Sequence, residues 1–323
     1  MPLEIKGLSR RFGDKWVLRD VEMSAREGRV LGLLGASASG KSVLLRLIAG
    51  LRPNGGSIAF NGRDLTGVRP KDRDVTLLSA ERAGPGAVLG LFGIAVRVSS
   101  SEEQIERFDE AIAKAGKIVL IDDAFCRLDA TLRDECFFKL RRAAVSRERI
   151  VIFATSDFQQ IAAVADDVAV LSDGSVARTG TSVEVYEDPR TVETCRLTGE
   201  ANLIAARRLS SSDDELPEFH TIDGGHRLFA HRADKKHLAP INQTMTLAIR
   251  PEQVVMSMGA SFPEDNLLRG VCTGIRFCGA TSLIEFDAAG LKLTTRVFRV
   301  VGLKPGDECM LGLPPHRMLI LRD

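Results

Sequence analysis

The fold is decided by the sequence GASASGKS, residues 35–42. It fits the pattern of a phosphate-binding loop, in which glycine, four variable residues and a second glycine are followed by lysine and serine. An apolar run, Val30–Leu34, precedes the loop, and a helix-like run, Val43–Ala49, follows it. This order of strand, loop and helix predicts a P-loop nucleotide-binding domain. The alternative is a serine-rich turn that merely begins a helix.

The predicted loop contains the groups that hold a nucleoside triphosphate. Backbone N–H groups of such a loop face inward and surround phosphate oxygens, and the start of the helix adds partial positive charge. Lys41 has the length to reach the terminal phosphates, and Ser42 has a hydroxyl that can bind Mg²⁺. The residues expected to contact the nucleotide are Gly35, Ala36, Ser37, Ala38, Ser39, Gly40, Lys41, Ser42 and Val43.

A second motif supports the first. Residues 118–123 have the sequence IVLIDD, an apolar strand that ends in two acids. P-loop enzymes place a carboxylate beside Mg²⁺ at the end of such a strand. We therefore expect Asp122 to be the acid on the metal side. The alternative is a buried strand that ends in two aspartates by chance.

The composition indicates a two-domain globular protein with no strong preference for nucleic acid or lipid. The chain has 323 residues, of which 44% are hydrophobic, and a net charge of +1, so no strong field favours either partner. Its six cysteines form no C-x-x-C pair, which fits a reducing compartment. The first residues lack an apolar signal segment, and the longest apolar stretch, Gly84–Val96, is too short to cross a bilayer. We expect a cytoplasmic protein that reaches a membrane only through partners.

The chain divides into two parts of different character. Residues 1–200 alternate between strand and helix patterns, which predicts a mainly parallel sheet with flanking helices, and Asn61-Gly62 marks a turn in an added antiparallel piece. Residues 201–323 show short strand patterns between Gly and Pro turns and predict a small all-β barrel or sandwich. In the first part, strands are expected at residues 3–8, 16–23, 29–34, 57–60, 75–78, 118–121, 150–154 and 168–171, and helices at 40–49, 102–114, 131–144, 158–165 and 181–186.

The chain resembles the ATP-binding subunits of ABC transporters, above all the importer type with a C-terminal, OB-like TOBE domain that serves sugars, polyamines or ferric iron. The likeness lies in LSRRFGDKWVLRDVEMSAREGRVLGLLGASASGKSVLLRLIAGL, IVLIDDAFCRLDATLRDE, LAIRPEQV and LKPGDECMLGLPPHRMLIL. It implies ATP and Mg²⁺ as ligands. It implies permease subunits and a second ATP-binding subunit as partners, at the inner face of the cell membrane. It also places Phe12 on the adenine and Asp129 in the D-loop at the dimer seam; a core phenylalanine and a helix N-cap are the alternatives.

Several residues depart from the family pattern where hydrolysis is catalysed. The family's glutamate that positions the attacking water is Asp123 here, whose carboxylate is one methylene shorter. A displacement of about 1 Å can cost on the order of 10²-fold in rate, so Asp123 is expected to be a slow general base or a spectator. The switch histidine is replaced by Ser156, and the Q-loop glutamine by Ser79 or Ala80.

The LSGGQ signature of the family is also missing. At its expected spacing from Asp122 the chain has Val98-Ser99-Ser100-Ser101-Glu102. Ser99 would match the signature serine, or the segment is simply the start of a helix. The stretch before it is short for the family, and Gly84-Pro85-Gly86 is expected to form a shortcut loop. The resemblance therefore implies a shortened helical subdomain, the part of these proteins that docks on permeases.

Three functions compete on these observations. The first is a degenerate ATP-binding subunit of an importer, which binds Mg·ATP and hydrolyses it weakly or not at all. The second is a cytosolic nucleotide-binding regulator that has left transport; recovery of the chain with a permease would exclude it. The third is a working ATPase with rearranged catalytic parts, which predicts that Asp123→Asn abolishes turnover. The transported substrate is not encoded in this chain.

Overall fold

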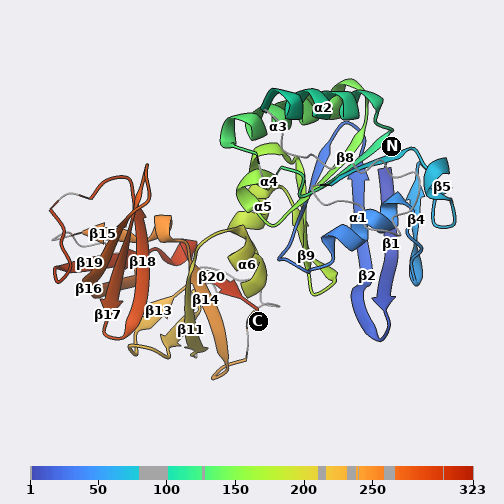
Figure 1. Ribbon diagram of the computed structural model, residues 1–323. Helices are drawn as coiled ribbons and strands as arrows, with labels where there is room; N and C mark the ends of the chain where they lie inside the picture. Colours follow the sequence, from blue (N-terminus) through green and yellow to red (C-terminus); the bar gives the residue numbers. More distant parts are fainter. Residues whose placement is uncertain are drawn as a thin grey trace. The chain divides into compact units, whose positions relative to one another are not determined.

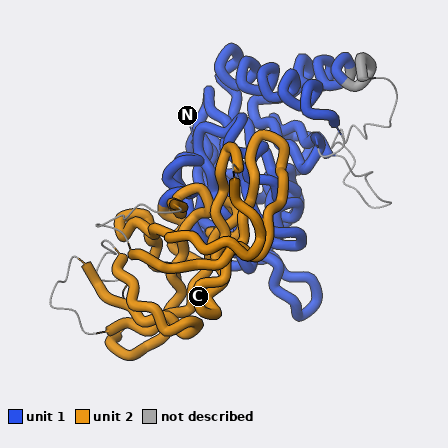
Figure 2. Tube along the Cα trace, turned by 90° about the vertical axis from the view of Figure 1, so that its left-hand side faces the viewer, with its two compact units in different colours: residues 1–187 blue, residues 188–323 orange. Residues whose placement is uncertain are grey.

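The computed structural model describes residues 2–79, 101–125, 128–209, 216–230, 238, 240–257, 266–300 and 302–322. It divides into two compact units, Met1–Glu187 and Asp188–Asp323 (Figure 2). Among the described residues no helix is both long and apolar enough to span a membrane.

A six-stranded sheet forms the centre of the first unit. All its neighbouring strands are parallel except the edge strand β10, which runs antiparallel to β9. Every residue of β3 and of β7 is buried, as expected for parallel strands that are covered on both faces. In sheet order the strands are β10 (Ser175–Gly180), β9 (Asp167–Ser172), β3 (Val30–Leu34), β8 (Ile150–Thr155), β7 (Ile118–Asp122) and β6 (Val75–Ser79).

A second, antiparallel sheet joins the first through a shared core. Its strands, in order, are β2 (Lys15–Arg26), β1 (Pro2–Phe12), β4 (Gly55–Phe60) and β5 (Arg63–Asp64). Asn61 and Gly62 connect β4 to β5 with φ values of 52° and 76°, the left-handed pair of a tight hairpin turn, so the predicted turn is confirmed. Helix α1 (Lys41–Ala49) follows the phosphate loop and buries Leu44, Leu47 and Ile48 in the core that both sheets share.

Helices pack against the central sheet of the first unit as well (Figure 1). The aromatic rings of Phe108, Phe125, Phe137 and Phe153 contact one another in this layer, with ring centroids 5.4–5.7 Å apart. Gly32 in β3 is required by the packing of α4, because a Cβ there would lie 2.7 Å from the Ile161 side chain. The helices are α2 (Ser101–Lys114), α3 (Ala130–Ser146), α4 (Phe158–Val164) and α5 (Ser182–Glu187).

The second unit is built mainly from strands, and the predicted all-β domain is confirmed. Two five-stranded sheets, in which all pairings are antiparallel, enclose one apolar core that includes Phe219, Leu247, Phe286 and Leu311. One sheet contains β13 (Arg227–Phe229), β12 (Glu218–Thr221), β11 (Asn202–Arg208), β14 (Thr244–Ile249) and β20 (Leu319–Leu321), and the other β15 (Val255–Ser257), β19 (Glu308–Leu313), β16 (Asn266–Phe277), β17 (Ser282–Ala288) and β18 (Leu291–Val297).

The chain passes from the first compact unit to the second between Glu187 and Asp188, whereas the sequence predicted a domain boundary at residue 200. The difference is the short helix α6 (Val192–Thr198), which packs with the second unit. Its Cys195 joins a small apolar cluster with residues of β14 and β20. The buried guanidinium of Arg250 donates hydrogen bonds to the Cys195 and Gly199 carbonyls at 3.0 and 3.1 Å. These contacts are distant in sequence, so no local pattern reveals them.

Another buried arginine holds the end of the phosphate-loop helix. Arg73, only 6% exposed, donates from Nη1 to the carbonyls of Leu47 and Ile48 at 2.9 and 2.7 Å, and from Nε to Val68 at 3.0 Å. Burial lowers the pKa of this guanidinium, and Asp64 partly opposes the shift. The last carbonyls of a helix have no partner within the helix. Arg73 therefore fixes the C-terminal end of α1 from outside.

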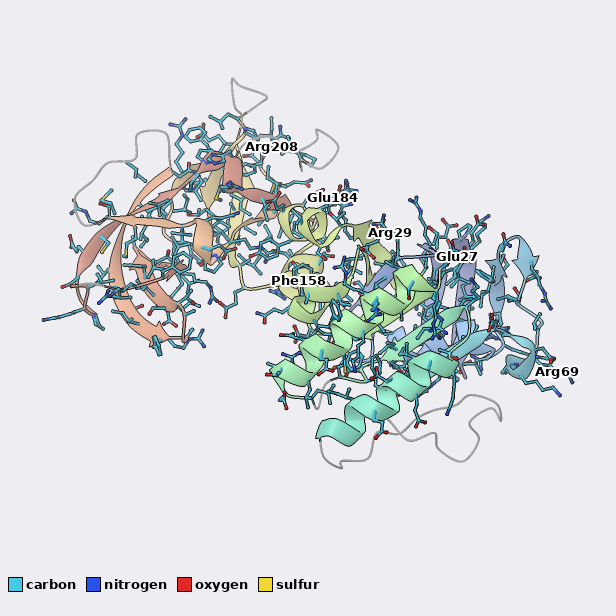
Figure 3. The ribbon with its side chains drawn as sticks, turned by 90° about the horizontal axis from the view of Figure 1, so that it is seen from above. Glu27, Arg29, Arg69, Phe158, Glu184 and Arg208 are labelled. Carbon is cyan, nitrogen blue, oxygen red and sulfur yellow. The ribbon has the colours of Figure 1, made fainter. Side chains whose placement is uncertain are left out.

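We predict that Arg73→Met lowers the free energy of unfolding of the first unit by about 2–4 kcal/mol. The substitution removes charge-assisted hydrogen bonds and leaves buried carbonyls without a donor. Urea unfolding followed by the fluorescence of Trp16, the single tryptophan, measures this unit. Arg69→Met is the matched control. Arg69 is exposed on the surface of the first unit (Figure 3), where it pairs with Asp72, so its loss should cost less than about 1 kcal/mol. Equal effects of the two variants would contradict the prediction.

Candidate nucleotide site

The carboxyl ends of three parallel strands bring the predicted motifs together. Leu34 of β3 pairs with Thr155 of β8, and Asp122 of β7 pairs with Ala154 of β8. The phosphate loop after β3, the acids at the end of β7 and the residues after β8 therefore lie at one edge of the sheet. This is the edge at which open α/β sheets bind ligands.

The phosphate loop has the tight backbone that its glycines allow. Ala38 and Gly40 have φ values of 65° and 106°, in the left-handed region. A Cβ on Gly35 would lie 2.5 Å from the Leu171 carbonyl oxygen, and one on Gly40 would lie 2.7 Å from the Leu18 side chain. Both motif glycines are therefore required by sterics. Within the described part of the chain, the Ser39 hydroxyl oxygen is buried and has no hydrogen-bond partner, as expected for a group that a ligand would satisfy.

The Lys41 ammonium is bonded to its own loop. Its Nζ donates to the carbonyl oxygens of Gly35 and Ala36 at 2.7 and 2.8 Å. Burial lowers the pKa of Lys41, while the carboxylates of Asp123 and Asp122 act in the opposite direction. The ammonium is held over the loop by two carbonyls and faces two acids. It must exchange these carbonyls for phosphate oxygens if a triphosphate binds.

Ser42 and Asp122 form the candidate Mg²⁺ site. The Ser42 hydroxyl donates to Oδ1 of Asp122 at 2.9 Å, and Asp122 is only 7% exposed. A hydroxyl and a carboxylate are the oxygen donors that Mg²⁺ uses beside phosphates and water. The donor set fits the ion. When bound, Mg²⁺ would neutralise phosphate charge at this position.

Asp123 is held against strand β8 by contacts that the sequence did not reveal. Its φ is 49°, its N–H donates to the Ala154 carbonyl at 2.9 Å, and its Oδ1 accepts from the Thr155 hydroxyl at 3.3 Å. Thr155 is 1% exposed, whereas Asp123 itself is exposed. The side chain of Asp123 thus points toward β8 in this state. No local pattern singles out Thr155, because its role depends on strand pairing.

The remaining positions that the resemblance marked have different surroundings. Ser156 is exposed between β8 and α4. Ser79, one of the two Q-loop candidates, ends β6 and pairs with Asp122. Asp129 is the N-cap of α3, where its Oδ1 accepts a hydrogen bond from the Leu132 N–H at 3.0 Å. The predicted N-cap role is therefore confirmed. Ser99, Ala80 and the loop Gly84-Pro85-Gly86 lie outside the described residues.

Phe12 ends β1 and is 48% exposed, so it is not a core phenylalanine. The guanidinium of Arg10 lies over this ring at 4.7 Å from its centroid. On the neighbouring residues, the guanidinium of Arg11 lies 5.7 Å from the centroid of Trp16. An exposed ring with one stacked face is a suitable platform for a planar base.

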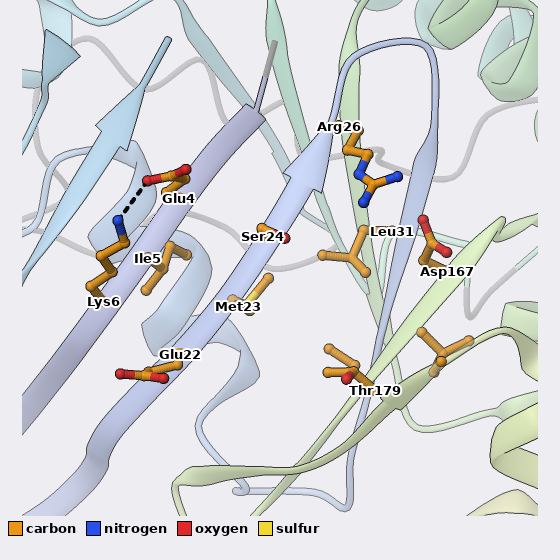
Figure 4. Close-up of a pocket in the computed structure, with 13 residues that line it drawn as sticks. Glu4, Ile5, Lys6, Glu22, Met23, Ser24, Arg26, Leu31, Asp167 and Thr179 are labelled. Atoms are coloured by element: carbon orange, nitrogen blue, oxygen red, sulfur yellow. Dashed lines mark ion pairs between the residues drawn. The ribbon is translucent and has the colours of Figure 1, made fainter. Parts of the chain in front are cut away.

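A cavity of about 640 Å³ lies elsewhere in the first unit, between strands of its two sheets (Figure 4). Its lining includes Leu31 and Asp167, near the amino ends of β3 and β9, and the ion pair of Glu4 with Lys6. It is therefore at the opposite edge of the sheet from the phosphate loop. It does not belong to the nucleotide site.

Two domain families and several known proteins match this chain. The ABC transporter family matches residues 18–82, and the TOBE domain family matches residues 247–321. A sulfate/thiosulfate import ATP-binding protein of Bacillus cereus is 30% identical over 263 residues, covering 68% of this chain and 74% of that protein. An Fe(3+) ions import ATP-binding protein of Photorhabdus laumondii is 25% identical over 99% of this chain and 97% of its own length.

A spermidine/putrescine import ATP-binding protein of Haemophilus ducreyi is 27% identical, over 92% of this chain and 89% of its own length. The chain belongs to the ATP-binding proteins of ABC importers. Among solved structures, an ATP-binding subunit of an ABC transporter aligns with 56% of this chain and 90% of its own chain, at 19% identity and a TM-score of 0.47. The two family matches fall on different units of the chain, the first around the phosphate loop and the second on the all-β domain.

Proposed function

We propose that this protein binds Mg·ATP at the edge formed by β3, β7 and β8, hydrolyses it weakly or not at all, and acts as the ATP-binding subunit of an importer. The observation that carries the proposal is the joint geometry of Lys41, Ser42 and Asp122. The ammonium and the Ser42–Asp122 pair occupy the places of a phosphate clamp and a metal ligand pair. Residues 35–43 would hold the phosphates, and Phe12 would stack on the adenine.

Weak hydrolysis is supported by the residues at the two positions where the family carries its catalytic glutamate and switch histidine. The short carboxylate of Asp123 is engaged by Thr155, and Ser156 provides an exposed hydroxyl in place of an imidazole. A hydroxyl cannot take up a proton near neutral pH as a histidine can. The groups that hold ATP are therefore retained, and the groups that activate water are altered.

The proposed partners are a second ATP-binding subunit and a membrane permease, which would place the protein at the inner face of the membrane. The relatives are import proteins by name, for sulfate/thiosulfate, Fe(3+) and spermidine/putrescine. These names differ in cargo, so no cargo is assigned. Asp129 would lie at the seam between the two ATP-binding subunits.

The docking region, which the sequence predicts to be shortened, favours a second candidate function, that of a nucleotide-binding regulator outside transport. The alignment with the Fe(3+) relative runs over 359 positions, although this chain has only 323 residues. The Fe(3+) relative therefore contains residues that have no counterpart in this chain. The ABC transporter match also ends at residue 82, close to the point where the sequence predicts that the helical subdomain is shortened.

We predict that Lys41→Ala weakens Mg·ATP binding by about 10- to 100-fold, because it removes a charge-assisted contact to the phosphates. Calorimetric titration of the full-length protein measures the affinity. Lys114→Ala is the matched control, since Lys114 is an exposed helix lysine paired with Glu110, and it should leave the affinity unchanged. Unaltered ATP affinity in Lys41→Ala would refute binding at the phosphate loop.

We also predict that the purified protein releases phosphate from saturating Mg·ATP far more slowly than about 1 s⁻¹, the lower end of typical enzyme turnover. Asp123→Asn should bind ATP as the wild type does and leave this slow release unchanged, because the short carboxylate of Asp123 is already engaged by the Thr155 hydroxyl. A continuous phosphate-release assay tests both. Brisk release that Asp123→Asn abolishes would identify a working ATPase instead.

A further inference from the structure

Two stacks of arginine on an aromatic ring lie close together at the end of the β1–β2 hairpin. Arg10 and Phe12 are two residues apart in β1 and share one face of the strand, as alternate strand residues do. Arg11 pairs across the ladder with Trp16. The guanidinium–ring distances are 4.7 Å in the first stack and 5.7 Å in the second. The hairpin thus contains two similar stacks, of which only the first includes the predicted base-stacking residue.

Arg10 is anchored, which separates it from an ordinary surface arginine. Its Nη1 donates to the Arg52 carbonyl at 2.8 Å, and its Nε is buried with no partner among the described residues. Arg52 lies in the segment that follows α1, and Asn54 in the same segment donates its N–H to the Ser9 carbonyl of β1 at 2.9 Å. The guanidinium is therefore fixed between the ring and the backbone that leaves the phosphate-loop helix.

We propose that Arg10 is a positioning residue for the nucleotide base. Its guanidinium covers one face of the Phe12 ring, and this support holds the ring so that its other face stacks on adenine. The inference rests on the proposed function, because it requires ATP on the phosphate loop. A planar guanidinium can stack on a ring and keep an edge hydrogen bond at the same time, which an ammonium cannot do.

The role of Arg10 makes a prediction about which part of the ligand is affected. A cation over an aromatic ring contributes about 0.5–1 kcal/mol at exposed sites, which corresponds to an affinity change of about two- to fivefold. Arg10→Ala should therefore weaken ATP binding by about two- to fivefold. Its affinity for inorganic tripolyphosphate, which has no base, should not change. Arg10→Lys should restore the ATP affinity only in part.

The experiment is calorimetric titration of the full-length protein with ATP and with tripolyphosphate, both with Mg²⁺. Arg11→Ala is the matched control and should bind both ligands as the wild type does, and circular dichroism verifies that each variant is folded. Unchanged or tighter ATP binding in Arg10→Ala, or an equal loss for both ligands, would overturn the role of Arg10 alone. A wild type that binds neither ligand would overturn the proposed function, and the role of Arg10 with it.

Discussion

The parallel pairing of β3 and β7 with β8 is the constraint on which the site depends. Because β8 lies between the other two strands, its pairing with them sets the positions of the phosphate loop after β3 and of Asp122 at the end of β7. The hydrogen bond from Ser42 to Asp122 then joins two segments that are 80 residues apart in sequence. A slip of one residue in the pairing of β7 with β8 would turn Asp122 to the other face of the sheet. Ser42 would then lose its hydrogen bond to Asp122.

Buried arginines hold the helix ends that this arrangement needs. Arg73 binds the last carbonyls of α1, and Arg149 donates to carbonyls at the end of α2 in the same way. Arg250 does so for α6 in the second unit. Each guanidinium satisfies several backbone acceptors at once, which its planar fork of donors permits. Fixing the far end of α1 leaves its amino end, with Lys41 and Ser42, as the part of the helix that a ligand can contact.

Much of the fold was predictable because its elements are encoded locally. All the strands and helices expected in residues 1–200 are present, since buried apolar runs such as β3 and the motif before α1 need no distant information. The strands β5, β10, β11, β12, β13 and β15 and the helix α6 were missed. The buried residues of α6 include Thr194 and Thr198, so it lacks an apolar period. In the site, the expected residues around Lys41 come together. No local sequence pattern indicated the roles of Thr155 and Arg10. The contact of Thr155 with Asp123 depends on the pairing of β7 with β8, and that of Arg10 depends on its stacking on Phe12.

Lys41 and Ser42 are the groups that would exchange their internal hydrogen-bond partners for a bound ligand. A crystal structure with ATP and Mg²⁺ tests this most directly. We expect Lys41 Nζ to leave the carbonyls of Gly35 and Ala36 for phosphate oxygens, and the Ser42 hydroxyl to turn from Asp122 to the metal. A nucleotide bound elsewhere, with Lys41 still on its own loop, would contradict it.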